Sequence, residues 1–281
     1  MRIEVVPAAS LPHAERAALW TEAFSDYFTP GVFTADSLAG FERAFDLDRE
    51  ASRVVVEDGN PVAFAMLGIR GQRGWVGGMG VVPAARRRRH GERVMQAILD
   101  AARERRLGVV RLEVLVQNAP AIPLYASLGF RTLRKLEVWD RAADAPALTA
   151  PEHPARPISI DAVAARLGGD HLARAPWQRE LEAARAAFPD LAALEADAGV
   201  VAIFRASPER VGLLEVSPAG AAGAAAESGL DRILATIFSV PATRPARLLN
   251  LPEGDPAGPA LTRAGLAVSH RQWEMEIALA S

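Results

Sequence analysis

Four consecutive arginines, followed closely by a glycine, form the segment of this sequence best suited to chemistry. The segment spans Arg86 to Gly91 and follows a strand-like apolar run that Pro83 ends. Guanidinium groups bind phosphate oxygens, and a glycine lets the backbone approach a ligand closely. The segment is therefore a candidate cradle for a phosphate or pyrophosphate group.

A helix is predicted to begin directly after this loop. Apolar residues recur there at helical spacing, namely Val94, Ala97, Ile98, Ala101 and Ala102. The first amide N–H groups of a helix lack intrahelical partners, and the helix dipole is positive at that end, so both favour an anion. Two other interpretations stay open: a solvated charged face and a nucleic-acid patch.

Composition excludes several classes of protein. A chain of 281 residues, half of them apolar, can build one large or two modest domains. The formal net charge of −2 gives no electrostatic reason to expect nucleic acid or an anionic membrane. There is no cysteine, which excludes disulfides, thiolate nucleophiles and cysteine-bound metals. No signal-peptide core or membrane-spanning run is present, so we expect a cytoplasmic protein.

The elements expected to position the loop alternate in type along the chain. Strands are predicted at 2–6, 52–57, 61–69 and 75–82, and helices at 12–28 and 34–45. Thr34 is a candidate N-cap, and 58–60 is a hairpin turn. Glycines crowd the strand 75–82, which indicates a bulge or the close approach of a ligand.

After the loop, the predicted helix ends at Gly108, and a strand covers 109–116. Asn118 can cap a short helix that Gly129 terminates, before a last strand at 131–139.

Two motifs in this order resemble the GNAT superfamily of acyl-CoA-dependent N-acyltransferases. The first is Arg88-Arg89-His90-Gly91-Glu92-Arg93, which follows the family's phosphate loop except that Arg93 replaces a small residue. The second runs from Asn118 through Leu124, Tyr125 and Leu128 to Gly129 and Phe130. The resemblance covers roughly residues 1–140.

The resemblance implies acetyl-CoA as co-substrate, no metal, and direct attack of an amine on the thioester. It places coenzyme A against Met79, Gly80, Val81, Val82, Arg86, Arg87, Arg88, Arg89, His90, Gly91, Glu92, Arg93 and Asn118. A backbone N–H of Met79, Gly80 or Val81 would stabilise the oxyanion. Tyr125 stands where the family keeps its general acid, although it could also be a core aromatic residue. We expect His90 to be exposed or beside the ligand.

The general base and the acceptor site are less clearly marked. Glu113 would share one face of its strand with Arg111, and it could face the cleft as base or pair with Arg111 or Arg134. Further candidates for the base are Glu22, Asp26 and Tyr27. An aromatic wall of Tyr27, Phe28 and Trp75 could bind an amine, or these rings could pack the first helix on the sheet.

The second half repeats the order of elements after a proline-rich linker. Helices are predicted at 158–167, 177–187, 219–240 and 256–264, and strands at 200–206, 211–216, 247–250 and 266–279. This half contains no tyrosine, and its loop 217–223 lacks arginines. We therefore expect a degenerate GNAT-like domain that acts as scaffold, cleft wall or dimer surface, while Gly220 and Gly223 leave a second coenzyme A site open.

The sequence thus predicts an α+β protein with two GNAT-like domains, at 1–140 and 157–281, joined by the linker 141–156. The expected activity is acetyl transfer to a primary amine of a small molecule or peptide, with no nucleic acid or membrane partner; a homodimer stays open. The alternatives are a catalytically silent acyl-CoA-binding or interaction protein and, third, a nucleic-acid-binding module.

Overall fold

The chain folds into two compact units. The structure is a computed structural model that describes residues 2–29, 31–239 and 244–279. One unit consists of Met1–Leu133 together with Trp273–Ser281, and the other of Arg134–Gln272. Both contain helices and a mixed sheet, so the predicted α+β class is confirmed. The division differs from the predicted one because the last residues of the chain join the first unit.

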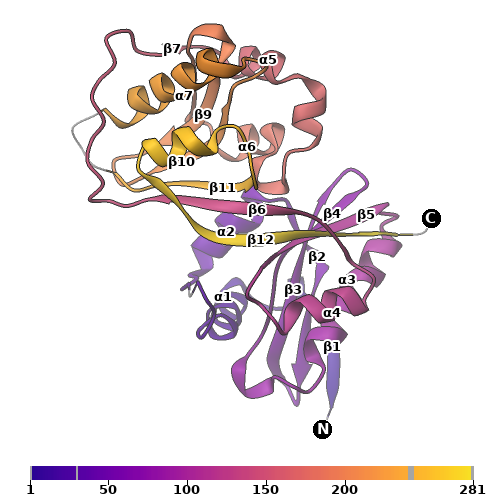
Figure 1. The fold of residues 1–281 in the computed structure, drawn as a ribbon. Helices are drawn as coiled ribbons and strands as arrows, with labels where there is room; N and C mark the ends of the chain where they lie inside the picture. The colour runs from indigo at the N-terminus through magenta and orange to yellow at the C-terminus, as the bar shows by residue number, and fades with distance from the viewer. Residues whose placement is uncertain (1, 30, 240–243, 280–281) are drawn as a thin grey trace. The chain divides into compact units, whose positions relative to one another are not determined.

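The first unit is built on a mixed sheet with the strand order β1-β2-β3-β4-β5 (Figure 1). Its strands are β1 (Ile3–Pro7), β2 (Leu47–Glu57), β3 (Asn60–Arg70), β4 (Arg73–Val81) and β5 (Val109–Leu115). Neighbours are antiparallel except β4 and β5, which are parallel. The end of β12 (Leu266–Ala278) adds a strand beside β5, where Leu279 N–H donates to the Gly108 carbonyl at 2.9 Å.

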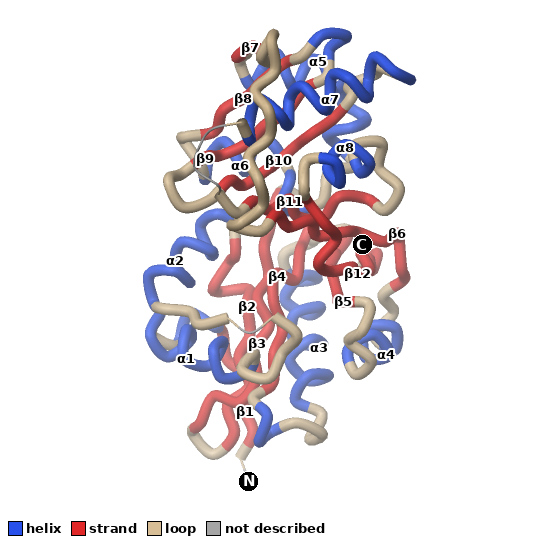
Figure 2. The backbone as a smooth tube through the Cα atoms, turned by 60° about the vertical axis from the view of Figure 1, so that its left-hand side comes forward, coloured by secondary structure: helices blue, strands red, loops and turns tan. Residues whose placement is uncertain are grey.

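Helices cover both faces of this sheet. As Figure 2 shows, α1 (His13–Ala23) and α2 (Ala35–Ala44) lie on one face, and α3 (His90–Glu104) lies on the other with α4 (Ala121–Ser127) beyond it. The buried side of α3 carries the predicted apolar stripe, including Val94 and Ile98. Thr34 caps α2 in a capping box with Ser37, which confirms the predicted helix start.

The hairpin between β2 and β3 was predicted correctly, whereas the end of α3 was not. The hairpin between β2 and β3 uses Asp58 and Gly59, both with positive φ, as predicted. The end of α3 was expected at Gly108, but the left-handed residue is Arg106, and Leu107 N–H donates to the Ala102 carbonyl at 3.0 Å. Leu107 is buried, so its packing fixes an early helix end without a glycine.

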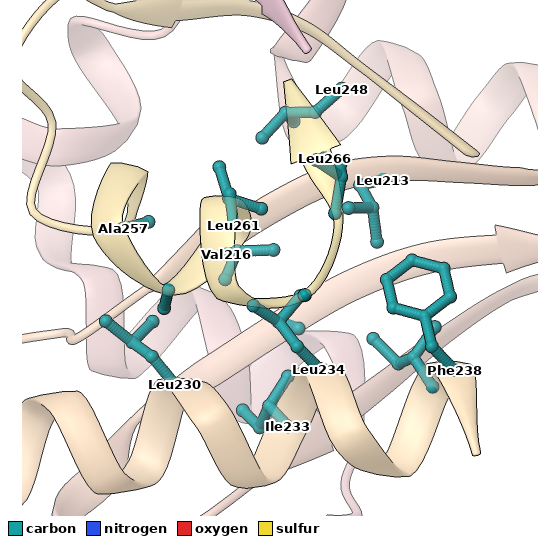
Figure 3. Packing of buried hydrophobic residues seen from close by; sticks show 14 of the residues in the cluster. Leu213, Val216, Leu230, Ile233, Leu234, Phe238, Leu248, Ala257, Leu261 and Leu266 are labelled. Atoms are coloured by element: carbon teal, nitrogen blue, oxygen red, sulfur yellow. The ribbon is translucent and has the colours of Figure 1, made fainter. Parts of the chain in front are cut away.

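The second unit has the strand order β12-β6-β11-β10-β9-β8-β7. Its elements are β6 (Arg131–Arg141), β7 (Arg156–Pro157), α5 (Ile160–Ala173), α6 (Leu181–Ala187), β8 (Leu191–Glu195), β9 (Val201–Ala206), β10 (Val211–Ser217), α7 (Gly223–Phe238), β11 (Ala246–Pro252) and α8 (Gly258–Arg263). Strands β10 and β11 are parallel. Leu230, Ile233 and Leu234 of α7 pack into the core of this unit (Figure 3).

The two units share a pattern of elements but exchange their last strands. The series β3-β4-α3-β5-α4 corresponds to β9-β10-α7-β11-α8, and each series has one parallel strand pair. The strand that follows α4 is β6, which pairs with β11; the strand that follows α8 is β12, whose end lies beside β5. Each sheet is therefore completed by chain from the other half. Within the described residues, no helix has the length and apolar character that crossing a bilayer requires.

Candidate active site

The parallel strands β4 and β5 separate part way along their length. Their ladder joins Arg73–Val76 to residues 109–112, yet β4 continues to Val81 and β5 to Leu115. A register shift in the β3–β4 ladder places a bulge at Gly77, directly after the ladder with β5 ends. The bulge bends β4 where the strands diverge, so a gap opens between the carboxyl-terminal parts of two neighbouring strands.

The backbone of β4 presents donors to this gap. Val82 N–H donates to the Val62 carbonyl at 2.9 Å and therefore points toward β3. Because N–H groups alternate in direction along a strand, those of Val81 and Met79 point the other way, toward the gap, and that of Gly80 points toward β3. Of the three N–H groups that the sequence offered for an oxyanion, the geometry favours those of Met79 and Val81.

The arginine loop leads from β4 into α3 through two left-handed residues. Arg87 has φ 62°, and Arg89, the N-cap of α3, has φ 63°. A non-glycine residue in this conformation costs about 1–2 kcal/mol, and alternating right- and left-handed residues aim successive N–H groups at one point. No side chain caps α3, so the first N–H groups of a helix of 15 residues stay available to an anion.

The loop arginines do not all have free guanidinium groups. Arg86 makes a bidentate ion pair with Asp26, 2.6 Å for each contact, and also donates to the carbonyls of Val81 and Ala23. This arginine ties the loop to the end of α1. It was predicted to bind the cofactor, and in the structure its guanidinium group is engaged by Asp26 and two backbone carbonyls.

The remaining guanidinium groups differ in their partners. Arg88 pairs with Glu57 at 2.9 Å, and Arg89 pairs with Glu92 at 2.7 Å. Arg87 is exposed and makes no ion pair with the residues that the structure describes. Arg87 is thus the arginine most available to a phosphate group.

His90, the first residue of α3, is buried at 1% exposure, so the expectation of a solvent-exposed ring is wrong. Its Nε2 lies 3.7 Å from Glu57 Oε2, and its Nδ1 lies 3.4 Å from Nη1 of Arg93. The ring packs beneath the loop, so its role is to support the start of the helix.

Tyr125 lies buried on α4, at 6% exposure. Burial raises the pKa of its phenol, and the neighbouring Tyr27 adds a smaller rise. Its hydroxyl makes no hydrogen bond within the described part of the chain. A neutral phenol without a protein partner can donate its proton to a ligand.

Asn118 joins Tyr27 to the start of α4. Its Nδ2 donates to the Tyr27 hydroxyl at 3.3 Å, and its Oδ1 accepts from Ala121 N–H at 3.3 Å. Asn118 thus contacts the first residue of α4, but the N-cap position itself is Pro120 and no side chain caps the helix there, so the predicted cap is only partly reproduced. Burial raises the pKa of Tyr27, which keeps this phenol neutral as well. Both tyrosines of the chain thus belong to this part of the first unit.

Gly91 brings three elements together at the site. A Cβ atom at this position would lie 3.4 Å from Leu124, 3.6 Å from Val81 and 3.9 Å from Met79. The first turn of α3 therefore packs against both the end of β4 and α4. Helix α4, which carries Tyr125, therefore lies against both the β4 donors and the start of α3.

The other candidate residues are occupied by protein contacts. Glu113 Oε2 accepts from Trp75 Nε1 at 2.7 Å, so the pairing with Arg111 that the sequence allowed is replaced by one with Trp75. Arg111 instead pairs with Glu276 of β12 at 2.6 Å. Asp26 is held by Arg86, which lowers the pKa of its carboxyl. Neither carboxylate is placed as an unengaged base.

The predicted aromatic wall is part of a larger ring cluster. The ring centroid of Tyr27 lies 5.3 Å from that of Phe28 and 5.0 Å from that of Phe24. At the opposite end of the cluster, the ring centroids of Trp75 and Phe45 are 5.8 Å apart. Trp20, Phe33, Phe41 and Phe64 connect these ends. Trp75 is buried and Phe28 is 53% exposed, so of the three residues of the predicted wall Phe28 is the most open to solvent.

The glycines of β4 are explained by packing. A Cβ atom at Gly78 would lie 2.5 Å from the Trp20 ring, and one at Gly80 would lie 2.8 Å from Ala23. Both contacts are with α1. Close approach of this helix to the sheet, and the bulge at Gly77, therefore account for these glycines without a ligand.

In the second unit the corresponding gap is filled by an arginine. The β10–β11 ladder ends at Leu213 and Leu248, and Arg179 reaches between the strands from a short 3-10 helix. Its Nε donates to the Leu214 carbonyl at 2.8 Å and its Nη1 to the Asn250 carbonyl at 3.4 Å. Sequence reasoning missed Arg179, because no local pattern marks a side chain that bridges two distant strands.

Comparison with known proteins now bears on these observations. Residues 17–130 match the model of the acetyltransferase (GNAT) family. No match was found among the curated proteins.

Among solved structures, the chain is similar over its whole length to three proteins described as acetyltransferases or tandem GNAT proteins. A GCN5-related N-acetyltransferase from Sphaerobacter thermophilus has 18% identity and a TM-score of 0.72, over 98% of this chain and 95% of that one. A tandem GNAT protein from the clavulanic acid biosynthesis pathway has 17% identity and a TM-score of 0.65, over 100% and 99%. A putative acetyltransferase from Pyrococcus horikoshii has 14% identity and a TM-score of 0.63, over 99% and 89%. At these identities the likeness concerns the fold.

Proposed function

We propose, from the premise that the first unit of this chain belongs to the acetyltransferase (GNAT) family, that it transfers an acetyl group from acetyl-CoA to a primary amine. One observation carries the proposal. The uncapped start of α3, the end of β4 with its outward N–H groups, and helix α4, which carries the unbonded phenol of Tyr125, pack together at Gly91. These groups supply an anion site, an oxyanion site and a proton donor.

In the proposed reaction the pyrophosphate of acetyl-CoA binds the N–H groups at 88–91 and the guanidinium group of Arg87. The thioester carbonyl accepts hydrogen bonds from Met79 or Val81, whose N–H groups face the gap. The amine nitrogen attacks the carbonyl carbon, and the C–S bond of the tetrahedral intermediate breaks. Tyr125 protonates the leaving thiolate, and the proton lost by nitrogen passes to water, since Glu113 and Asp26 are engaged.

Acetyl transfer can be tested without interference from protein thiols. The chain has no cysteine, so a thiol reagent such as 5,5′-dithiobis(2-nitrobenzoate) reports only released coenzyme A. We expect thiol release above the hydrolysis rate with at least one amine in a panel of aminoglycosides, polyamines, amino acids and peptide N-termini. Calorimetry with coenzyme A measures the binding step separately. Failure of coenzyme A to bind would exclude the proposal.

A catalytically silent acyl-CoA-binding protein is the second candidate. It is favoured by the contacts that engage two of the three carboxylates predicted as bases, Glu113 with Trp75 and Asp26 with Arg86. Such a protein would bind coenzyme A in the calorimeter and release no thiol with any amine of the panel. The two measurements therefore separate the two candidates.

A further inference from the structure

The second unit contains a polar cavity that the proposed acetyl transfer does not use. Its volume is about 500 Å³, and a smaller cavity of about 340 Å³ shares His171, Leu167 and Asp255 with it. The larger volume lies in the range of small-molecule sites. Charged side chains dominate its lining, including Asp170, Arg174, Arg179 and Glu215.

The floor of this cavity is a buried ion pair. Glu215 and Arg179 are 6% and 7% exposed, and Arg179 Nη2 lies 2.8 Å from Glu215 Oε2. His171 Nε2 lies 3.4 Å from the same oxygen. The other oxygen, Oε1, has no hydrogen-bond partner among the described residues. Because Oε1 keeps some solvent exposure, a ligand N–H can reach it as an acceptor.

Asp255 supplies a second acceptor in the same wall. Its Oδ1 accepts from Ala257 N–H at 2.9 Å, while Oδ2 has no partner within the described chain. Burial raises the pKa of the Asp255 carboxyl, and the charge of Glu215 adds to this rise. A cationic group bound between the two carboxylates would offset both effects.

One cationic and one anionic side chain of the cavity lining, Arg174 and Asp170, are exposed and form no ion pair with the described residues. Arg174 is exposed, and its guanidinium group makes no ion pair with the described residues, whereas its backbone carbonyl accepts from Arg134 Nη2 at 2.7 Å. Asp170, one turn away on α5, is exposed and also lacks an ion pair within the described chain. A free guanidinium group at this place can bind a carboxylate or phosphate group of a ligand.

Other ligand classes fit this cavity less well. The described residues contain no group of three or more His, Asp or Glu side chains arranged for a metal ion. The pantetheine arm of coenzyme A would need the gap between β10 and β11, which Arg179 fills. A purely anionic ligand would face Glu215 and Asp255, and a purely cationic one would leave Arg174 unused.

We propose that this cavity binds a small zwitterion, a molecule with a primary amine directed at Glu215 and Asp255 and an acid group directed at Arg174. The proposal concerns a second site and does not depend on acetyl transfer in the first unit.

Four compounds with one carbon skeleton test the charge pattern on the full chain. They are 2-aminobutanoate and 4-aminobutanoate as zwitterions, butylamine as the amine alone, and butanoate as the acid alone. We expect calorimetry to show at least one zwitterion binding about tenfold or more tightly than either single-group compound. If neither zwitterion binds, or if butylamine or butanoate binds as tightly as both, the proposal is wrong.

Variants assign the two ends of the ligand. Asp255→Asn and Arg174→Ala should each weaken zwitterion binding about tenfold, and Asp255→Asn should also weaken butylamine. Arg210→Ala is the matched control, because Arg210 is exposed in the same unit and does not line the cavity. Circular dichroism verifies that each variant is folded. Binding that is unchanged in both cavity variants, or lost equally in the control, would overturn the assignment.

Discussion

The parallel strand pairs β4/β5 and β10/β11 show how one backbone arrangement can serve two purposes. Each pair separates after a short ladder, ending at Val76 in the first unit and at Leu213 in the second. Backbone groups that a separated pair exposes need other partners. In the second unit Arg179 bonds to both strands; in the first, the outward N–H groups of β4 face the proposed acyl-CoA. The comparison shows that a single side chain, Arg179, is sufficient to close the gap between two separated parallel strands.

The largest expected effect is a loss of turnover when the first unit loses its proposed proton donor, which the second unit lacks because it contains no tyrosine. Tyr125→Phe should lower turnover by about 10²- to 10⁴-fold, because it removes the proton donor for the thiolate. Coenzyme A affinity should stay within about twofold, since the hydroxyl bonds no protein group in the described structure. Thiol release and calorimetry measure the two quantities. Tyr27→Phe tests the second phenol separately, because its hydroxyl accepts from Asn118 and the sequence also offered it as a base.

An equal loss of turnover and coenzyme A affinity in Tyr125→Phe would mean that this residue packs the site and donates no proton.

Arg179→Met tests whether the filled gap stabilises the second unit. Removing the guanidinium group leaves Glu215 buried with His171 as its remaining cationic neighbour, which should cost about 3–5 kcal/mol of unfolding free energy. The double variant Arg179→Met, Glu215→Leu should recover part of that loss, because no buried charge remains unpaired. Urea unfolding followed by circular dichroism measures both. A single-variant cost below about 1 kcal/mol would contradict a structural role for the arginine.

Gly91 and Gly223 lie in the first turns of the equivalent helices α3 and α7, and substituting them should have smaller effects than the changes above. Gly223, the first residue of α7, has φ 58° and open space around it, so Gly223→Ala should cost about 1–2 kcal/mol in backbone strain and leave coenzyme A affinity unchanged. A Cβ atom at Gly91 would make only ordinary van der Waals contacts, at 3.4 Å or more, so Gly91→Ala should leave stability nearly unchanged and weaken coenzyme A only if the ligand passes close to this backbone, as proposed. Thermal unfolding and calorimetry give the two readouts. Weaker coenzyme A binding in Gly223→Ala would place a nucleotide site in the second unit.

These comparisons also show which features could be predicted from the sequence. Local signals were sufficient for the arginine loop before a helix and for the contact of Asn118 with the start of α4, because the residues involved are neighbours in the chain. The partner of Arg86 lies 60 positions away at Asp26, and no spacing rule identifies it. The glycines of β4 had two interpretations, and only the position of α1 decides between them.

A strand and a strand pairing were missed for different reasons. Strand β8 has the sequence Leu-Ala-Ala-Leu-Glu, whose residues favour helix, and its pairing with β9 overrides that preference. The exchange of β6 and β12 was not predicted because hydrophobic alternation fixes which face of a strand is buried and does not fix which strand lies beside it. The first failure concerns two strands that are neighbours in the chain, and the second concerns pairings between distant segments.

The smallest expected effect is a difference in the pH dependence of the two units near neutrality. A hydrogen bond to Glu215 raises the pKa of His171, with Asp255 adding to the rise and Arg179 opposing it. The folded state therefore holds a proton that the unfolded chain releases above about pH 6.5. The associated stability is complete below that pH and is lost as the pH rises through the folded pKa. Because His171 is partly exposed, we expect less than about 1 kcal/mol.

The first unit should respond to pH in a different range. Its tyrosines have raised pKa values, so their contribution to stability is complete below about pH 10 and is lost above it. Urea unfolding between about pH 5.5 and 8.5 should thus show a decrease in stability that His171→Gln removes and Tyr125→Phe retains. If the unfolding free energy of His171→Gln falls with pH as steeply as that of the unchanged protein, the contact with Glu215 is too solvated to distinguish the units. A charged hydrogen bond is strengthened by desolvation, and that strengthening would then be absent.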